Sequence, residues 1–354
     1  MKNVLILQSE ISSYNVSTFN YISQSYLLTV GYLTKDKSNI DCSFEKKKFQ
    51  IINVGPFTFV KGLRDYCRNF DVICIMPNLR ILSYSVLPFL NHHNKMISWS
   101  IGFRVSYTHP YLTDRKRNIM DFIFQLVLSN CDANIFYMKK SKEFWRKTSL
   151  RMDNVFEAIN TTNVVKIDFA PESKRDFLFV GTLYKGKGLD LLLEAFKSVV
   201  TQCNCDIKLQ IVGEGSERES LEAYVIEHGL QDRVVFHGSI YDENEISKVF
   251  QESLLCFSPK QAGLSVPKSM GYGVPFVTRK DAITGGEIYH ITSGVNGIMY
   301  DIDDDLPKIM FDAIENRQKF IEMGRNAMEY YYNHATIKHM AQGAIDAIEY
   351  ALNH

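Results

Sequence analysis

The sequence predicts an α/β protein made of two tandem doubly wound, Rossmann-like domains that face a cleft. The chain has 354 residues, which suits two domains of ordinary size. Short apolar runs alternate with amphipathic stretches, and this order favours parallel sheets with helices on both faces. The alternation restarts after a polar, irregular segment at 164–174, where we expect the linker between the domains.

Each half follows this strand–helix order. In the first half we expect buried strands at 4–7, 26–33, 70–76, 95–99 and 133–137, and helices at 81–90 and 115–128. In the second half we expect strands at 175–180, 207–212, 234–236, 254–257 and 275–278, and helices at 189–200, 217–228 and 335–352. The predicted domains are therefore 1–168 and 169–335, followed by a C-terminal helix at 336–354 that can cross back to the first domain.

The charge is unevenly distributed. Apolar residues make up 45% of the chain and charged residues 23%, which excludes a disordered or fibrous protein. The 40 basic and 40 acidic residues balance, yet residues 1–168 carry 22 basic against 13 acidic residues and 169–354 carry 18 against 27. The basic half suits phosphates or an anionic membrane, although two solvated surfaces that attract each other explain the asymmetry equally well. Nucleic acid is disfavoured, because no recognition module accompanies the basic residues.

The cysteines and the N-terminus indicate a cytoplasmic protein. The seven cysteines are odd in number, and Cys203-x-Cys205 lacks the second pair of ligands that a zinc site needs. Cys74 and Cys256 lie in apolar runs and are expected to be buried thiols, a pattern typical of a reducing compartment. The N-terminal apolar run is too short for a signal peptide or a membrane span. Any membrane contact would be peripheral, on the inner face of the plasma membrane.

Glycine-containing loops at strand ends predict an anion site in the second half. Backbone N–H groups point outward at the carboxyl ends of parallel strands, where they can receive a phosphate. The loop at 181–188 combines glycines with Lys187, and the loop at 284–287 carries two glycines and Glu287. In the loop at 257–275 we expect Ser265 to cap a helix whose first N–H groups hold a diphosphate. Any one glycine pair could be only a tight turn, but three such loops in one domain favour a site.

The second half resembles the retaining, nucleotide-sugar-dependent glycosyltransferases of the two-domain GT-B type, in the large family 4 grouping. The resemblance rests on Lys187-Gly188 and on the segments 211–216, 235–238, 258–275 and 285–297. In the first half, the segments 11–14, 99–104 and 160–161 look like members of that family that act in bacterial surface-polysaccharide assembly, of capsule, lipopolysaccharide or exopolysaccharide type.

The resemblance implies a role for each of a set of residues. The residues that the resemblance assigns to catalysis are Lys187 and Lys260. Those it assigns to donor binding are Gly181, Thr182, Lys187, Gly213, Gly238, Ser239, Ile240, Gly263, Leu264, Ser265, Lys268 and Glu287. Those it assigns to acceptor binding are Tyr14, Gly102, Arg104 and Asn160. The chain departs from the family at Lys260 and Lys268, where two Glu are usual, and at Thr182, where Arg is common. These departures leave the nucleotide and the sugar open, and we interpret them as a subfamily character.

The implied reaction moves a sugar from a UDP- or GDP-sugar to a glycan or a polyprenyl-diphosphate-linked acceptor, with retention of configuration. No Asp-x-Asp stands at a strand end of the second domain, so we expect no metal and no cofactor. Basic residues from Arg104 to Lys147, with Trp145, Tyr107 and Tyr111 among them, could form an amphipathic surface against the membrane, or they could simply solubilise ordinary helices. Two alternatives remain: a catalytically inactive sugar-nucleotide-binding protein and, with less support, a sugar-nucleotide epimerase.

Overall fold

The chain divides into two compact units. The computed structural model describes residues 1–90, 93–102, 117–203 and 205–354. The N-terminal unit comprises the described residues up to Thr162 together with Ile337–His354, and the C-terminal unit includes Asn163–Thr336. The boundary therefore precedes the linker predicted at 164–174, because that segment packs within the C-terminal unit. The last helix, Ile337–Asn353, is part of the N-terminal unit.

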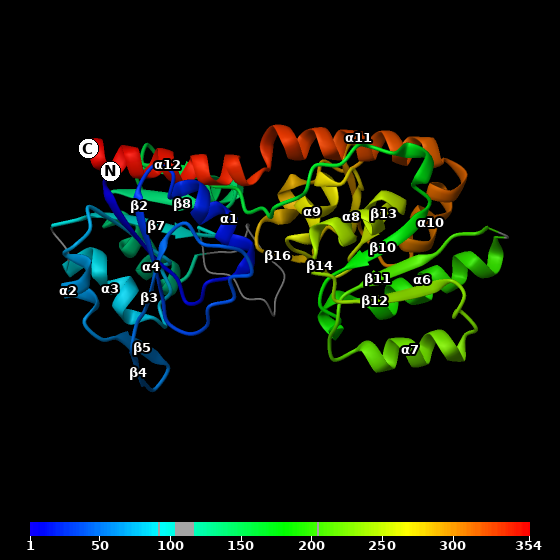
Figure 1. Ribbon diagram of the computed structural model, residues 1–354, viewed down its shortest axis with the longest axis horizontal. Helices are drawn as coiled ribbons and strands as arrows, with labels where there is room; N and C mark the ends of the chain where they lie inside the picture. The colour runs from blue at the N-terminus through cyan, green and yellow to red at the C-terminus, as the bar shows by residue number, and fades with distance from the viewer. Residues whose placement is uncertain (91–92, 103–116, 204) are drawn as a thin grey trace. The chain divides into compact units, whose positions relative to one another are not determined.

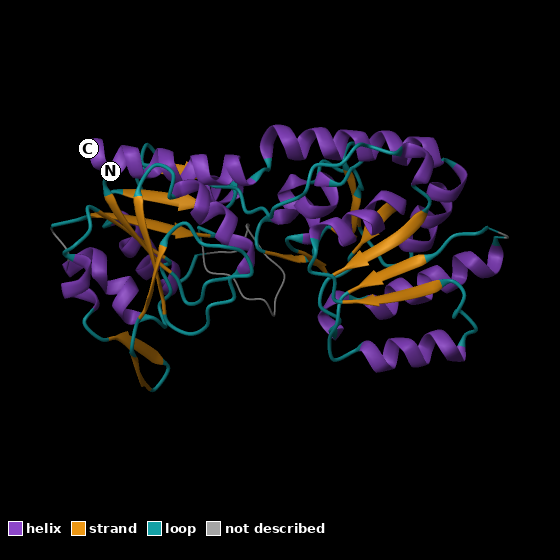
Figure 2. Ribbon diagram, viewed as in Figure 1, coloured by secondary structure: helices purple, strands orange, loops and turns teal. Residues whose placement is uncertain are grey.

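The N-terminal unit is built on a parallel seven-stranded sheet in the order β3-β2-β1-β6-β7-β8-β9 (Figures 1 and 2). Its strands are β1 (Asn3–Leu7), β2 (Leu27–Tyr32), β3 (Glu45–Lys48), β6 (Val72–Ile75), β7 (Lys95–Ser100), β8 (Ala133–Phe136) and β9 (Val155–Glu157). Its helices are α1 (Ser13–Ile22), α2 (Leu63–Cys67), α3 (Leu82–Leu90), α4 (Ile119–Ser129), α5 (Lys139–Trp145) and α12 (Ile337–Asn353). A separate antiparallel hairpin joins β4 (Ile51–Val54) to β5 (Phe57–Val60).

Helices cover both faces of this sheet, which explains why its strands are continuous apolar runs. Successive side chains of a strand point to opposite faces. In β1, Val4 and Ile6 join the core formed with α1 and α12, whereas Leu5 and Leu7 join the core formed with α2, α3 and α4. The alternating side chains of β1 therefore contact α1 and the C-terminal helix α12 on one face of the sheet, and α2, α3 and α4 on the other.

The C-terminal unit repeats the plan with a parallel six-stranded sheet in the order β12-β11-β10-β13-β15-β17. Its strands are β10 (Asp176–Val180), β11 (Leu209–Val212), β12 (Val234–Gly238), β13 (Ser253–Phe257), β15 (Phe276–Arg279) and β17 (Gly297–Tyr300), with a small parallel pair of β14 (Gln261–Ala262) and β16 (Ile283–Thr284). Its α-helices are α6 (Leu189–Gln202), α7 (Arg218–Glu227), α8 (Glu243–Glu252), α9 (Ser265–Gly271), α10 (Asp305–Glu315) and α11 (Arg317–His334), and its 3-10 turns are η1 (Pro171–Ser173), η2 (Lys185–Lys187) and η3 (Glu287–His290).

The fold class is confirmed, and the differences lie in elements whose sequence pattern is weak. The strand β3 consists of one Glu and three Lys, all exposed, at the edge of its sheet, so no apolar run signals it. The helix α1 has few apolar residues and was not predicted. The helix predicted at 115–128 begins at Ile119, because the Asn118 side chain accepts hydrogen bonds from the N–H groups of Met120 and Asp121. Residues 115–116 lie outside the described part of the chain.

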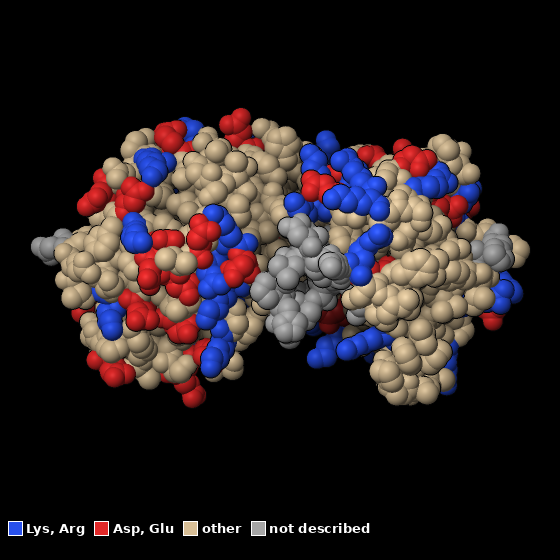
Figure 3. All heavy atoms as spheres, turned by 180° about the vertical axis from the view of Figure 1, so that it is seen from behind, with Lys and Arg blue, Asp and Glu red and all other residues tan. Residues whose placement is uncertain are grey.

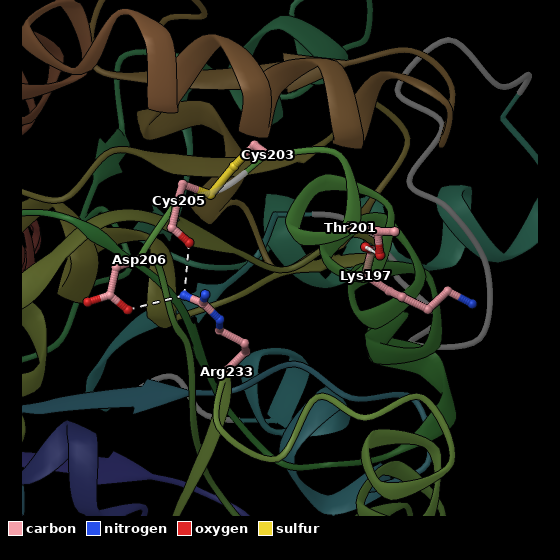
Figure 4. Close-up of a disulfide and its surroundings, with 6 residues drawn as sticks. All are labelled: Lys197, Thr201, Cys203, Cys205, Asp206 and Arg233. Atoms are coloured by element: carbon pink, nitrogen blue, oxygen red, sulfur yellow. Dashed lines mark hydrogen bonds and ion pairs between the residues drawn. A yellow bond between two sulfur atoms is a disulfide. The ribbon is translucent and has the colours of Figure 1, made fainter.

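The cysteines correct one expectation. Cys203 and Cys205 form a disulfide, which the pattern of a reducing compartment did not predict (Figure 4). Arg233 donates a hydrogen bond to the carbonyl oxygen of Cys205 at 2.8 Å and pairs with Asp206 at 3.1 Å (Figure 4). Of the free thiols, those of Cys74 and Cys256 are buried as expected. Cys67 and Cys131 are also buried, and Cys42 is half-buried. Among the described residues, none of the helices combines the length and the apolar character that crossing a membrane requires.

Candidate functional site

Three glycine loops meet at the carboxyl ends of β10, β11 and β12. The N–H of Gly181 donates to the carbonyl of Val212 at 3.0 Å, and the N–H of Gly213 donates to the carbonyl of Gly238 at 2.8 Å. A Cβ on Gly213 would lie 1.8 Å from the carbonyl oxygen of Gly181, so only glycine permits this approach. The fold thus brings together Gly181, Gly213 and Gly238, which the sequence assigned to one site.

The ammonium of Lys187 is buried beside these loops. The residue is 9% exposed, and its Nζ would lie 3.4 Å from a Cβ on Gly181. Within the described part of the chain, no group accepts a hydrogen bond from this ammonium; it lies 5.9 Å from the ring centroid of Tyr184. Burial lowers the pKa of Lys187 below its usual value, and the charge of Glu287 opposes part of that shift. A desolvated cation that lacks an acceptor favours the binding of an anion.

The carboxylate of Glu287 is held by its own turn. Its Oε2 accepts hydrogen bonds from the N–H of Gly285 at 2.8 Å and from the hydroxyl of Thr284 at 3.1 Å. These two bonds fix the glycine loop in front of η3. Glu287 therefore acts on Lys187 through its charge, while its hydrogen-bonding capacity shapes the loop.

Lys260 lies directly beside Lys187. The N–H of Lys260 donates to the carbonyl of Lys187 at 3.2 Å. Its side chain passes over Gly188, where an added Cβ would come within 3.0 Å of Lys260 Cγ. Lys260 is half-buried and has no ion-pair partner among the residues that the structure describes. The loop after β13 thus brings a second cation toward the loop after β10.

The helix start behind Gly263 differs from the predicted one. Ser265 is the first helical residue of α9, and the residue in the capping position is Leu264, with no side-chain cap. The reason is local: Leu264 already has helical backbone angles, φ −59° and ψ −14°, so the helix conformation begins one residue early. In the described ranges, no acceptor is found for the N–H groups of Gly263, Leu264 and Ser265. These amides remain available, but the serine hydroxyl does not cap them.

Lys268 has a partner that sequence reasoning missed. Its Nζ pairs with Glu243 Oε1 at 2.7 Å, and the hydroxyl of Tyr272 donates to Glu243 Oε2 at 2.8 Å. Glu243 begins α8, far from Lys268 in the sequence, so no motif or spacing signalled the pair. The positive charge expected at Lys268 is therefore largely balanced within the protein.

The remaining donor-loop residues occupy strand ends. Thr182 follows Gly181 after β10, and its side chain is exposed. Ser239 and Ile240 follow β12; Ser239 is exposed and Ile240 is half-buried.

No group of three or more His, Cys, Asp or Glu residues that could hold a metal ion is found within the described ranges.

In the N-terminal unit, the predicted acceptor residues have different environments. Tyr14 is 40% exposed in the first turn of α1, and Asn160 is half-buried after β9. Gly102 is buried: a Cβ there would lie 2.5 Å from Ser141 Cβ, so the packing against Ser141 requires glycine at this position. Arg104 lies outside the described residues.

The position predicted for Trp145, on an amphipathic surface, is wrong. Trp145 is fully buried, and its indole N–H donates to the carbonyl of Gly102. Lys142 pairs with Glu157 at 3.1 Å and Lys140 pairs with Glu143 at 3.2 Å, whereas Lys139, Arg146 and Lys147 are exposed and have no ion-pair partner among the described residues. The predicted members Tyr107, Tyr111, Arg115 and Lys116 lie outside the described part.

Comparison with known proteins finds similarity to glycosyltransferases, with a family match almost wholly within the C-terminal unit. Residues 161–330 match the family model "Glycosyl transferases group 1". An uncharacterised glycosyltransferase of Haemophilus influenzae is 26% identical over 226 residues, covering 62% of this chain and 61% of the relative. The D-rhamnosyltransferase WbpZ of Pseudomonas aeruginosa is 30% identical over 166 residues, covering 44% of this chain and 40% of the relative. The chain thus matches about three fifths or less of these relatives' length.

Solved structures share the fold over nearly the whole chain. The crystal structure of Anabaena HepE in complex with UDP has a TM-score of 0.71 at 16% identity, and covers 99% of this chain and 100% of that one. The lipopolysaccharide outer core galactosyltransferase WaaB in its apo form has a TM-score of 0.67 at 16% identity, and covers 98% and 99%. At such low identities these likenesses establish the architecture: two units, each with a parallel sheet, as in GT-B glycosyltransferases.

Proposed function

We propose, on the match of residues 161–330 to the glycosyl transferases group 1 family model, that the chain transfers a sugar from a nucleoside-diphosphate sugar to a glycan or lipid-linked acceptor. The donor proposed is a UDP- or GDP-sugar. UDP is bound by HepE, which shares the fold, and UDP-glucose is present in another HepE structure with a TM-score of 0.68. The proposed setting is the synthesis of bacterial surface polysaccharide. It is supported by WaaB, which shares the fold and is a lipopolysaccharide outer core galactosyltransferase.

The observation that carries this proposal is the buried, acceptor-free ammonium of Lys187 at the strand ends of the C-terminal unit. When a sugar leaves its donor, the bond between the anomeric carbon and the phosphate oxygen breaks, and negative charge grows on the diphosphate. A fixed cation that has already lost most of its water stabilises that charge more in the transition state than in the ground state. Lys260 and the N–H groups of Gly263 and Leu264 would add to this stabilisation.

We further propose that the transfer retains the anomeric configuration and needs no metal. The acceptor hydroxyl oxygen forms the new bond to the anomeric carbon on the face that the nucleoside diphosphate leaves, and the hydroxyl proton passes to the departing diphosphate. Among the described residues, two lysines and three free amides can stabilise the developing charge, and they perform the role that a metal has in other transferases. Persistence of turnover in EDTA would support this part, and loss of turnover that Mg²⁺ restores would contradict it.

The deciding experiment incubates the purified chain with a panel of UDP- and GDP-sugars. An active transferase releases nucleoside diphosphate slowly by hydrolysis, and faster when a suitable acceptor is present. Thermal stabilisation without release would favour the second candidate, a sugar-nucleotide-binding protein without catalysis. The observation that favours that candidate is Lys268, which replaces a family carboxylate and is itself neutralised by Glu243. Interconversion of the sugar without an acceptor would indicate an epimerase and refute both.

A further inference from the structure

The N-terminal unit exposes large apolar side chains on four neighbouring elements. The helix α3 packs beside α4 and β5, β4 pairs with β5, and Thr58 of β5 forms a bridge with Ile81 in front of α3. The exposed side chains on these elements are Ile52, Val54, Phe57, Phe59, Val86, Phe89, Leu90, Ile119, Phe122, Ile123 and Leu126. We call them the apolar face. Soluble monomeric proteins rarely expose a contiguous apolar surface of this extent without a partner.

The helix α4 shows most clearly that the apolar face is unpartnered. It buries Phe124, Val127 and Leu128 in the unit. On the opposite side it presents apolar residues at helical spacing, among them Ile119 at 70% exposure and Phe122 at 57%. A helix that is apolar all round is expected to be covered on every side. The described protein covers only one side of α4.

Basic residues without acidic partners surround the apolar face. Lys61, Arg64, Arg80 and Arg117 are exposed, and none of them pairs with a carboxylate in the described ranges. The guanidinium of Arg64 donates to the carbonyl of Leu90 at 3.3 Å, which holds one cation at the edge of the face. In Figure 3 the β4–β5 hairpin, at the lower edge of the N-terminal unit, is uncharged and has Lys and Arg side chains on either side.

Carboxylates are nearly absent from the same elements. The hairpin residues 51–60 and the helix α3 contain no charged residue. The acidic residue of α2, Asp65, pairs with Arg68, and Asp121 of α4 is buried in the capping box of its helix. A second copy of this chain would oppose cations to cations across such a face, whereas a layer of lipid phosphates matches them.

We propose that the apolar face docks on a bilayer that contains anionic phospholipid. The Phe, Ile, Leu and Val side chains enter the boundary between headgroups and acyl chains, and the four cations contact lipid phosphates. The docked unit would present a transferase to acceptors anchored in the same membrane, which gives the proposed function a setting. The docking itself depends on neither donor binding nor turnover.

The first test mixes the full-length protein with sedimenting vesicles of phosphatidylcholine, with and without phosphatidylglycerol. Binding is expected to the anionic vesicles at low ionic strength, to weaken at about 0.5 M salt, where charges are screened within a few ångströms, and to be far weaker on phosphatidylcholine alone. Absence of binding to anionic vesicles at low salt would overturn the inference. Equal binding to both kinds of vesicle would overturn the role of the cations.

Variants test the residues of the face. We expect Phe122→Ser with Leu126→Ser to weaken vesicle binding at least tenfold, because both side chains lose their apolar contact with the bilayer. The matched control, Ile226→Ser with Tyr241→Ser, removes two side chains of the C-terminal unit that are even more exposed, and it should bind like the unmodified chain. Equal effects of the two pairs would overturn the assignment.

A second set of variants tests the cations. The triple variant Lys61→Gln, Arg64→Gln, Arg80→Gln should bind about a hundredfold more weakly, since each cation near an anionic surface contributes roughly a fivefold factor. The control replaces three exposed lysines of the C-terminal unit, Lys166, Lys208 and Lys248, by Gln and should bind normally. A control that loses as much binding would show a response to net charge alone and overturn the docking face.

Two further readouts separate this inference from the proposed function. Hydrolysis of a sugar nucleotide in solution should be unchanged in the variants of the apolar face, none of which belongs to the donor site. Failed vesicle binding with normal hydrolysis overturns the docking only, and normal vesicle binding without hydrolysis overturns the transferase only. If size-exclusion chromatography shows a dimer that the Phe122/Leu126 variant dissociates, the occupant is a second copy and the membrane inference is wrong.

Discussion

Replacing Lys187 by methionine should separate catalysis from stability. The folded protein holds this ammonium almost out of water without a hydrogen-bond acceptor, so removing it relieves a desolvation cost. A methionine of similar length fills the same space, and we expect an unchanged or higher melting temperature. The same substitution removes the cation proposed to stabilise the leaving diphosphate.

The loss of turnover can be estimated from the environment of Lys187. A charge about 4 Å from a phosphate oxygen contributes about 4 kcal/mol at an effective dielectric constant of about 20. The neighbouring carboxylate of Glu287 opposes part of this field, which leaves roughly 3 kcal/mol. We therefore expect kcat to fall about a hundredfold, comparable to the loss of one donor that stabilises a transition-state charge.

The assay follows release of nucleoside diphosphate from the donor sugar nucleotide that the panel identifies, together with the melting temperature. The control is Lys185→Met, which removes an exposed cation from the same turn, η2, and should keep nearly full kcat. Near-normal kcat in a folded Lys187→Met protein would refute the role assigned to this residue. A large fall in melting temperature would refute the account of its burial.

Three other predictions concern the C-terminal unit. Burial lowers the pKa of Lys174 to about 7 from 10.5, so the folded state disfavours the charged form, although its Nζ donates to the carbonyls of Phe250, Ser253 and Tyr272 at 3.3–3.4 Å. In denaturant unfolding, the stability of Lys174→Met relative to the unmodified chain should therefore be highest below pH 7 and should fall by at most about 1.4 kcal/mol per pH unit toward pH 10, and a difference that does not change with pH would contradict the shift. Gly213→Ala should prevent normal folding, because its Cβ would lie 1.8 Å from the carbonyl oxygen of Gly181. Gly263→Ala has open space around its Cβ and should melt within a few degrees of the unmodified chain. Similar melting temperatures of the two variants would contradict the close contact between Gly213 and Gly181. Glu243→Gln should free the charge of Lys268 and tighten nucleoside diphosphate binding roughly fivefold by calorimetry; weaker binding would indicate that Glu243 itself contacts the ligand.

The alternation of apolar runs and amphipathic stretches was enough to predict two parallel α/β sheets. A strand covered on both faces must be mostly apolar, as 4–7 in β1 and 254–257 in β13 are, and such runs are visible without coordinates. Edge elements escaped the same reasoning. In β3 the four side chains are exposed and charged, so its pairing with β2 comes from backbone hydrogen bonds that no apolar pattern records.

The candidate site was predictable as far as it depends on glycines and lysines in loops that follow strands. Strand ends bring such loops together in any parallel sheet, and Lys187 and Gly263 were found in this way, whereas Gly213 was assigned by the family resemblance. The partner of Lys268 was not predictable, because Glu243 reaches it from another helix. The interior positions of Trp145 and Gly102 were equally hidden, since a tryptophan among lysines has the same local pattern whether it faces solvent or the core.

Local sequence thus specified which segments form strands and helices and which loops can receive an anion, because hydrophobic periodicity and glycine act over a few neighbouring residues. Packing between distant segments decided which charges remain available. It left Lys187 buried without an acceptor, gave Lys268 a carboxylate, and turned one side of α4 to solvent. These outcomes depend on contacts across many residues of chain, and the free energy of a charge depends on what surrounds it in space.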